Sequence, residues 1–215
     1  VVTNGMVIPN YSSQDHWEKF NALGVSQYGQ MTAGSFMYIG PQGIVHGTTI
    51  TVMNAARKIK LNGSDKKCLL LVTSGLGGMS GAQPKAANIA GVVSITAEVN
   101  PKAAYKRFEQ GWVDGITENV DQAIDVALEK QKILQPHSIA YLGNIVTLWE
   151  RLVERNIHVD LGTDQTSLHN PWAGGYYPVG LSIEESNELM AKNSEAFKKK
   201  VEESLKRQVA AINKL

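Results

Sequence analysis

The chain has 215 residues, 43% of them hydrophobic, which suffices for one domain with a substantial core. Its 21 basic and 20 acidic residues nearly cancel, so the composition shows no electrostatic footprint for nucleic acid or an anionic membrane. A single cysteine, Cys68, excludes a disulfide framework within the chain and favours a reducing compartment. There is no signal peptide and no apolar run near the roughly 18 residues that a membrane span needs, so we expect no membrane partner.

The first part of the chain carries little periodicity and predicts an irregular entry segment over residues 1–29. The elements expected up to residue 67 are a short helix at 16–23, a short strand at 35–39, a helix at 48–59 and a polar turn at 60–67.

From residue 68 onward, apolar strands alternate with helical patterns. The expected strands are 68–74, 92–98, 138–142 and 158–162, and the expected helices are 82–90, 101–110, 120–134 and one after Asn144 that ends near residue 155. Such alternation predicts an α/β fold with a mostly parallel sheet and helices on both faces, in three layers.

The C-terminal part predicts a structured loop followed by two helices. The loop over 170–180 is rich in glycine, proline and aromatic residues, and Ser182 and Glu185 form a capping box that begins the first helix. A second cap, at Ser194, is expected to begin the last helix. Its apolar stripe is expected to contain Phe197, Val201, Leu205, Val209 and Ile212.

The most informative segment lies between residues 68 and 84, where a buried strand leads into a glycine turn and an alanine-rich helix. The glycines of the turn are Gly75, Gly77, Gly78 and Gly81. In dinucleotide-binding βαβ units, such glycines let the backbone approach a pyrophosphate at a helix N-terminus. The match to the G-x-G-x-x-G fingerprint is not literal, because the third glycine would fall at position 80, where this chain has Ser80.

The next predicted strand ends in an acidic residue, Glu98. It follows Gly77 by 21 residues, close to the separation of about 20 expected for the acid that binds the adenosine ribose hydroxyls. A glycine turn alone could merely reverse the chain, and an acid alone could merely end a strand. Together they predict a bound NAD-type cofactor, and NAD rather than NADP, because a carboxylate repels a 2′-phosphate. His16, His46, His137 and His158 share no ligand spacing, so we expect no metal site.

Several segments, in this order and spacing, resemble the urocanase family over nearly the whole chain. They are Tyr28-Gly-Gln-Met-Thr-Ala-Gly-Ser35, Tyr38-Ile-Gly-Pro-Gln-Gly-Ile44, Gly75-Leu-Gly-Gly-Met-Ser-Gly-Ala-Gln-Pro84, Asp164-Gln-Thr-Ser-Leu-His-Asn-Pro171 and Gly174-Gly-Tyr-Tyr-Pro178. The last segment and the run from Gly143 to Leu152 resemble the branch that contains animal and plant enzymes.

The resemblance implies a Rossmann-like NAD-binding domain of a urocanate hydratase, a cytoplasmic, homodimeric lyase of histidine degradation. Members of this family add water to urocanate and give imidazolonepropionate. They hold NAD⁺ tightly and use its nicotinamide as an electrophile toward the imidazole of the substrate, so the cofactor carries the chemistry and the protein orients it.

The resemblance also implies a set of cofactor-binding residues on this chain. They are Gln30, Gly77, Gly78, Met79, Ser80, Glu98, Asn144, Gln165, Thr166, Ser167, Leu168, His169, Tyr176 and Tyr177. Two positions depart from the bacterial pattern: an arginine near the ribose falls at Ala103, next to Lys102, and an alanine beside Asn144 becomes Ile145.

The family's catalytic cysteine, arginine and aspartate belong to a core domain, and Cys68 does not match that cysteine, so we expect no catalytic residue in this chain. The expected division is an entry segment of the core domain over 1–34, the Rossmann-like domain over 35–180, and C-terminal helices leading back to the core over 181–215. The chain starts without methionine and its last residues lie in a helical pattern, so we expect a fragment that folds and is inactive alone.

Two other functions fit a dinucleotide-binding domain. A conventional NAD-dependent dehydrogenase would need a Tyr-x-x-x-Lys motif or a placed histidine–acid pair, and neither Tyr105 nor Tyr141 has a lysine four residues on. The second alternative function is that of a non-enzymatic NAD-binding module. Urocanase core sequence flanking Val1 and Leu215 in the gene would exclude that module.

Overall fold

The computed structural model describes residues 13–24, 42–60, 68–163 and 171–215. The chain divides into two compact units, 1–43 and 44–215. In the first, the described structure is α1 (Gln14–Ala22), where the sequence predicts a helix at 16–23. The strand expected at 35–39 and most of the turn expected at 60–67 lie outside the described residues.

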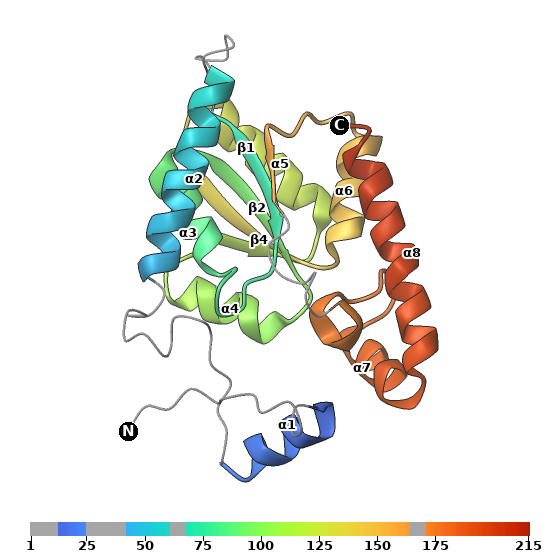
Figure 1. The fold of residues 1–215 in the computed structure, drawn as a ribbon. Coiled ribbons are helices and arrows are strands. Elements are labelled where there is room, and N and C mark those ends of the chain that lie inside the picture. Colours follow the sequence, from blue (N-terminus) through green and yellow to red (C-terminus); the bar gives the residue numbers. More distant parts are fainter. Residues whose placement is uncertain (1–12, 25–41, 61–67, 164–170) are drawn as a thin grey trace. The chain divides into compact units, whose positions relative to one another are not determined.

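A five-stranded, wholly parallel sheet forms the centre of the second unit (Figure 1). Its strands are β1 (Leu70–Ser74), β2 (Val93–Glu98), β3 (Gly115–Thr117), β4 (His137–Leu142) and β5 (Leu161–Gly162), in the spatial order β3-β4-β2-β1-β5. The predicted parallel sheet is confirmed. β3 was not predicted, because three half-buried residues are too few to show a period, and β5 is shorter than the predicted 158–162.

Helices cover both faces of this sheet. On one face lie α2 (Gln42–Lys60), α3 (Ala82–Ala90) and α4 (Pro101–Glu109), and on the other lie α5 (Val120–Lys132) and α6 (Ile145–Glu154) (Figure 1). The α/β prediction in three layers is therefore confirmed.

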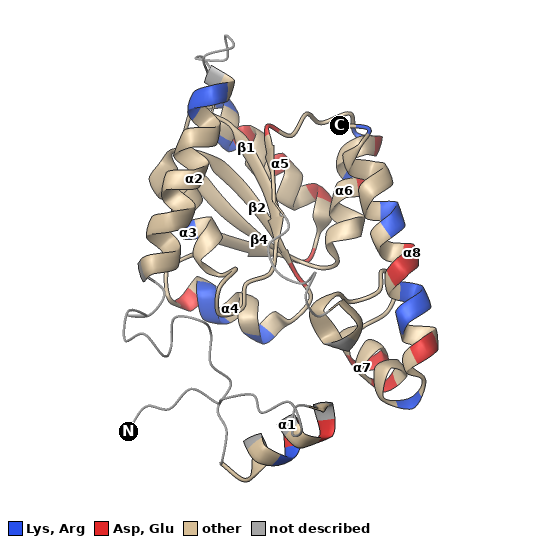
Figure 2. Cartoon of the chain, in the orientation of Figure 1, with Lys and Arg blue, Asp and Glu red and all other residues tan. Residues whose placement is uncertain are grey.

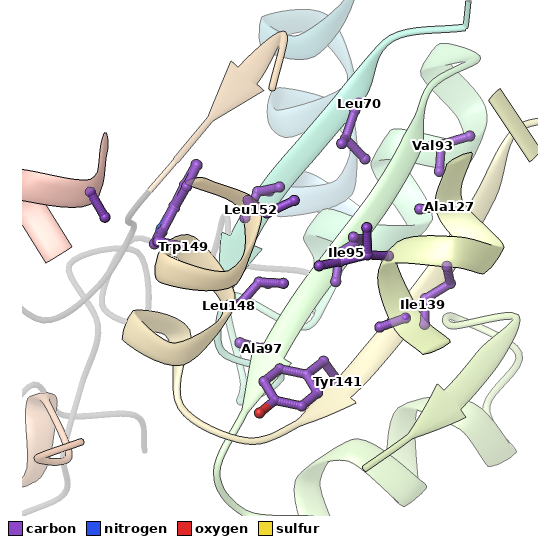
Figure 3. Close-up of a cluster of buried hydrophobic side chains, with 14 of the residues drawn as sticks. Leu70, Val93, Ile95, Ala97, Ala127, Ile139, Tyr141, Leu148, Trp149 and Leu152 are labelled. Atoms are coloured by element: carbon purple, nitrogen blue, oxygen red, sulfur yellow. The ribbon is translucent and has the colours of Figure 1, made fainter. Parts of the chain in front are cut away.

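The two sides of the core follow from the alternation of side chains along each strand. Leu70 and Val72 point to the face covered by α5 and α6, where Leu148 and Trp149 pack among the buried side chains (Figure 3). Leu69 and Leu71 face the opposite way, toward α2 and α3. Because strands buried on both faces read as continuous apolar runs, the central strands carry almost no charge, whereas lysine, arginine, aspartate and glutamate lie on the helices and loops (Figure 2).

Strand order reverses between β1 and β5. The chain passes from β1 through α3 to β2 on one side, and it returns from β4 through α6 to place β5 on the other side of β1. In open α/β sheets, ligands bind outside the carboxyl ends of the strands at such a switch point. The carboxyl ends of β1, β2 and β4 are in register, so the turns that follow them leave from one edge.

The C-terminal segment consists of η3 (Pro171–Gly175), α7 (Ile183–Lys192) and α8 (Ser194–Ile212). The predicted capping box of Ser182 and Glu185 is present. The predicted cap at Ser194 is wrong by one residue. Asn193 is the N-cap, and its Oδ1 accepts a hydrogen bond from the Ala196 amide at 3.0 Å.

The buried face of α8 also differs from the predicted stripe. From Phe197 to Val209 the stripe runs in steps of four residues, which drift around the helix, so its last members Val209 and Ile212 are 55% and 40% exposed. The buried residues alternate steps of four and three and stay on one side: Phe197, Val201, Ser204, Gln208 and Ala211.

Candidate functional site

The glycine turn leaves the carboxyl end of β1 and leads into α3. Gly75 has φ +89°, a left-handed conformation that favours glycine, and its amide donates to the Ala97 carbonyl of β2 at 2.8 Å. Leu76 is buried in the core, which anchors the turn, while the next three residues, 77–79, are exposed. The turn therefore presents its backbone to solvent from a fixed base.

Gly81 takes the place of the glycine that the fingerprint expects at position 80. A Cβ at Gly81 would overlap Arg107 Nε and lie 2.7 Å from the Gly77 carbonyl oxygen. The Gly81 amide donates to that same carbonyl at 3.1 Å. Ser80 is instead buried, with its side chain against Gly75. The position that needs a glycine for close packing is therefore Gly81, one residue after the position that the fingerprint predicts.

Gly77 and Gly78 have the geometry of an anion-binding turn. A Cβ built on either glycine would meet no atom within 4 Å, so space lies open in front of both. Within the described part of the chain, neither amide has a hydrogen-bond acceptor. Two free amides next to the N-terminus of α3 provide donors for a phosphate group.

Glu98, the last residue of β2, holds this turn in place. Its Oε2 accepts a hydrogen bond from the Leu76 amide at 2.6 Å, and its Oε1 accepts one from the Asn100 amide at 2.8 Å. Each carboxylate oxygen can accept a further hydrogen bond. Glu98 is half-buried, at the position where the sequence predicts ribose binding.

Arg107 of α4 is a site residue that the sequence did not reveal. Its Nε donates to the Leu76 carbonyl at 3.1 Å, and its Nη2 donates to the Gly77 carbonyl at 2.7 Å. The guanidinium also stacks on the Trp112 ring, 5.1 Å from its centroid. Arg107 lies 30 residues from Gly77 in the chain, so no local pattern connects them.

Asn144 is the N-cap of α6, directly after β4. Its Oδ1 accepts from the Val146 amide at 2.9 Å, and its Nδ2 donates to the Tyr177 carbonyl at 2.8 Å. Asn144 therefore joins the carboxyl edge of the sheet to the segment after η3. Its neighbour Ile145 packs against the buried cluster between the sheet and α6, which explains how a larger side chain is accommodated there.

The remaining predicted site residues fall in two groups. Tyr177 is half-buried, and its hydroxyl donates to Asn187 Oδ1 of α7 at 3.0 Å. Tyr176, beside it, is also half-buried. Met79 is exposed on the glycine turn. Outside the described residues lie Gln30, Gln165, Thr166, Ser167, Leu168 and His169.

A cluster of three polar side chains, of which Thr73 and Gln83 are buried and Thr163 is exposed, lies where strand order reverses. The hydroxyls of Thr73 and Thr163 are 2.7 Å apart, and they lie 3.1 and 2.7 Å from Gln83 Oε1. These residues come from β1, from α3 and from the position directly after β5. Sequence reasoning did not identify it, since threonine and glutamine in apolar surroundings carry no motif.

Metal and membrane sites have no counterpart in the described parts of the chain. No three histidine, cysteine, aspartate or glutamate side chains among the described residues are grouped so that they could hold a metal ion. None of the described helices is long and apolar enough to pass through a membrane.

The parallel sheet with helices on both faces, the glycine turn after β1 and the acid that ends β2 together define a Rossmann-like α/β domain. Residues 40–215 match the family model described as the Urocanase Rossmann-like domain, and residues 1–37 match the Urocanase N-terminal domain. The chain belongs to the urocanase family, as its sequence motifs predict.

Curated relatives from distant organisms agree with this assignment. The chain is 55% identical over 215 residues to "Probable urocanate hydratase" of Caenorhabditis elegans and 56% identical over 220 residues to "Urocanate hydratase" of Homo sapiens. It is 57% identical over 217 residues to "Probable urocanate hydratase" of Dictyostelium discoideum. In each comparison all of this chain is covered, but only 32% of the relative. The chain thus spans about a third of the length of these relatives.

Proposed function

We propose that this chain is the NAD⁺-binding part of a urocanate hydratase, which adds water to urocanate and gives imidazolonepropionate in histidine degradation. The names of its relatives and its membership of the urocanase family support the reaction. The cofactor proposal rests chiefly on one observation: Glu98 and the free amides of Gly77 and Gly78 lie at the same edge of the sheet.

The residues present fit a dinucleotide. The Gly77 and Gly78 amides would bind the pyrophosphate, in the open space that a side chain would fill. Glu98 would accept hydrogen bonds from the adenosine ribose, and its negative charge would exclude a 2′-phosphate, so we propose NAD⁺ rather than NADP⁺. Ser80, buried below the turn, would act through the backbone.

When bound, NAD⁺ would supply an electrophilic nicotinamide, and the chain would supply orientation. Asn144 would keep the segment around Tyr176 and Tyr177 at the carboxyl edge of the sheet through its bond to the Tyr177 carbonyl. Gln30 and the segment 165–169 are proposed to complete the cofactor site.

We propose that substrate chemistry needs residues beyond this chain. Cys68 is buried, and its Sγ donates to the Gly91 carbonyl at 3.2 Å, at the amino end of the sheet and away from the glycine turn. It is therefore unsuited to act on a substrate. We propose that residues 1–34 belong to a core domain and that residues 181–215 lead back to it. The intact protein would be a cytoplasmic homodimer.

Calorimetric titration with NAD⁺ and NADP⁺ of the full-length protein that contains this chain tests the proposal. We expect binding of NAD⁺, no comparable binding of NADP⁺, and turnover of urocanate. Gly78→Val should abolish NAD⁺ binding with the fold intact, because its side chain would enter open space that the pyrophosphate needs.

Gly47→Val in α2 is the matched control, since a Cβ there also meets no atom within 4 Å and Gly47 is not part of the glycine turn. It should bind NAD⁺ normally. Normal binding by Gly78→Val would contradict the pyrophosphate assignment. Oxidation of a substrate with release of NADH, in place of urocanate hydration, would favour a dehydrogenase, and binding without any turnover would favour a non-enzymatic module.

A further inference from the structure

The glycine turn is held by two charged side chains of opposite sign from two different elements. Glu98 of β2 accepts from the Leu76 amide, while Arg107 of α4 donates to the Leu76 and Gly77 carbonyls. Three successive peptide groups of the turn are therefore fixed by side chains: those that follow Gly75, Leu76 and Gly77.

The contacts of Arg107 determine the direction of the free amides. A peptide group is planar and trans, so its N–H points opposite to its C=O. The carbonyl of Leu76 shares a peptide group with the Gly77 amide, and the carbonyl of Gly77 shares one with the Gly78 amide. Because both carbonyls point at Arg107, the N–H groups of Gly77 and Gly78 point away from it.

Arg107 is itself fixed by its surroundings. Its Nη1 donates to Gln110 Oε1 at 2.7 Å, and Trp112 lies under the guanidinium. Lys85 Nζ of α3 also lies over this ring, 5.6 Å from its centroid. The absence of a Cβ at Gly81 leaves room for the guanidinium next to the turn. The planar guanidinium reaches the two carbonyls with two different nitrogens, which the single ammonium of a lysine cannot do.

We propose that Arg107 is a positioning residue for the cofactor: by holding the Leu76 and Gly77 carbonyls, it aims the Gly77 and Gly78 amides at the pyrophosphate. The inference rests on the proposed NAD⁺ site and adds to it a residue that does not touch the ligand. Its consequence is selective, since only ligands that carry a pyrophosphate use these amides.

Arg107→Met in the full-length protein tests this inference, with NAD⁺, ADP-ribose and adenosine as ligands. Methionine keeps an unbranched apolar stem on Trp112 but offers no donor. We expect NAD⁺ and ADP-ribose to bind about tenfold more weakly, and adenosine, which lacks the pyrophosphate, to change less than about twofold. Arg107→Lys should behave like Arg107→Met, because it restores the charge but not the two-nitrogen contact.

Arg207→Met is the matched control. Arg207 donates to both carboxylate oxygens of Glu150 at 2.8 Å, which links α8 to α6, and it makes no contact with the turn. It should leave the affinities for all three ligands unchanged. Thermal melting of each variant confirms that it is folded.

Three results would overturn the inference. Unchanged ADP-ribose affinity in Arg107→Met would show that the turn orients itself. An equal loss for adenosine would indicate general damage to the site, and full recovery by Arg107→Lys would show that charge alone suffices. Failure of the unaltered protein to bind NAD⁺ would instead overturn the proposed function, and this inference with it.

Discussion

Glu98 has two tasks in this structure, one structural and one proposed. Its carboxylate accepts the Leu76 and Asn100 amides, which ties the turn after β1 to the start of α4. Each of its two oxygens can accept one further hydrogen bond, which the ribose hydroxyls would donate. The same side chain would therefore shape the pyrophosphate turn and recognise the nucleoside, so its substitution should affect both.

Replacing Glu98 by glutamine should weaken NAD⁺ binding by about 1–3 kcal/mol, because an amide loses acceptor strength toward the ribose hydroxyls and the Leu76 amide. The variant should also discriminate less against NADP⁺, because the negative charge is gone. Calorimetric titration with both nucleotides measures the two effects. Glu118→Gln, an exposed glutamate before α5, should leave both affinities unchanged, and an unchanged dissociation constant for Glu98→Gln would refute the ribose assignment.

Asp114, in the loop before β3, joins α3 to β4 at the edge of the sheet opposite the glycine turn. Its Oδ2 accepts from Asn88 Nδ2 of α3 at 2.7 Å, and from the Ser138 amide and hydroxyl of β4 at 2.8 and 2.9 Å. Partial burial raises the pKa of Asp114, but the hydrogen bonds from Ser138 and Asn88, with the nearby His137, outweigh it and bring the pKa below its ordinary value of 3.8.

The lowered pKa of Asp114 predicts an acid-dependent loss of stability. The folded state favours the carboxylate, so the stabilisation is complete above pH 3.8 and is lost as the pH falls through the folded-state pKa. We expect the difference in Tm between the unaltered protein and Asp114→Asn to be larger at pH 5 than at pH 3. Thermal unfolding at both pH values measures this difference.

His137, next to Asp114, also titrates differently in the folded protein, but its effect on stability begins at a higher pH than that of Asp114. Burial lowers the pKa of His137 below its ordinary 6.5, although Asp114 opposes the shift, so its effect on stability begins as the pH falls through 6.5. Asp114→Asn in a His137→Gln background should therefore still show the difference between pH 5 and pH 3. A difference in Tm that is the same at both pH values would contradict the role of the carboxylate.

The C-terminal helix is integrated into the second unit and is not an appendage. α8 packs against α6, α7 and the η3 turn, and its Ala211 belongs to the same buried cluster as the central strands. The ion pair of Arg207 with Glu150 of α6 is partly exposed and adds little, so apolar burial dominates this contact.

Phe197→Ala should therefore lower the free energy of unfolding of the whole unit by about 3–5 kcal/mol, because Phe197 is fully buried and its loss leaves a cavity. Val209→Ala, on the exposed side of the same helix, should change it by no more than about 0.5 kcal/mol. Urea denaturation of both variants measures this. Similar small losses for both would show that α8 folds apart from the sheet.

Residues 35–180 were expected to be the Rossmann-like domain, whereas the family models divide the chain after residue 37 and before residue 40. The domain division remains a prediction. The amino-acid pattern was sufficient for the alternation of strands and helices, for the bounds of α3, and for Glu98 at the end of β2. These features depend on interactions within a few residues, namely the periods of burial, the freedom of glycine and the position of caps.

The contacts that shape the site could not be predicted in this way. Arg107 and Gly77 are 30 residues apart, Asn144 and Tyr177 are 33 apart, and Thr73 and Thr163 are 90 apart. Each pair meets only because parallel strands bring their carboxyl ends to one edge, and a parallel connection separates neighbours by a helix or more. The sequence alone therefore determined the elements and the chemistry at their ends, and the sheet determined which of those ends came together.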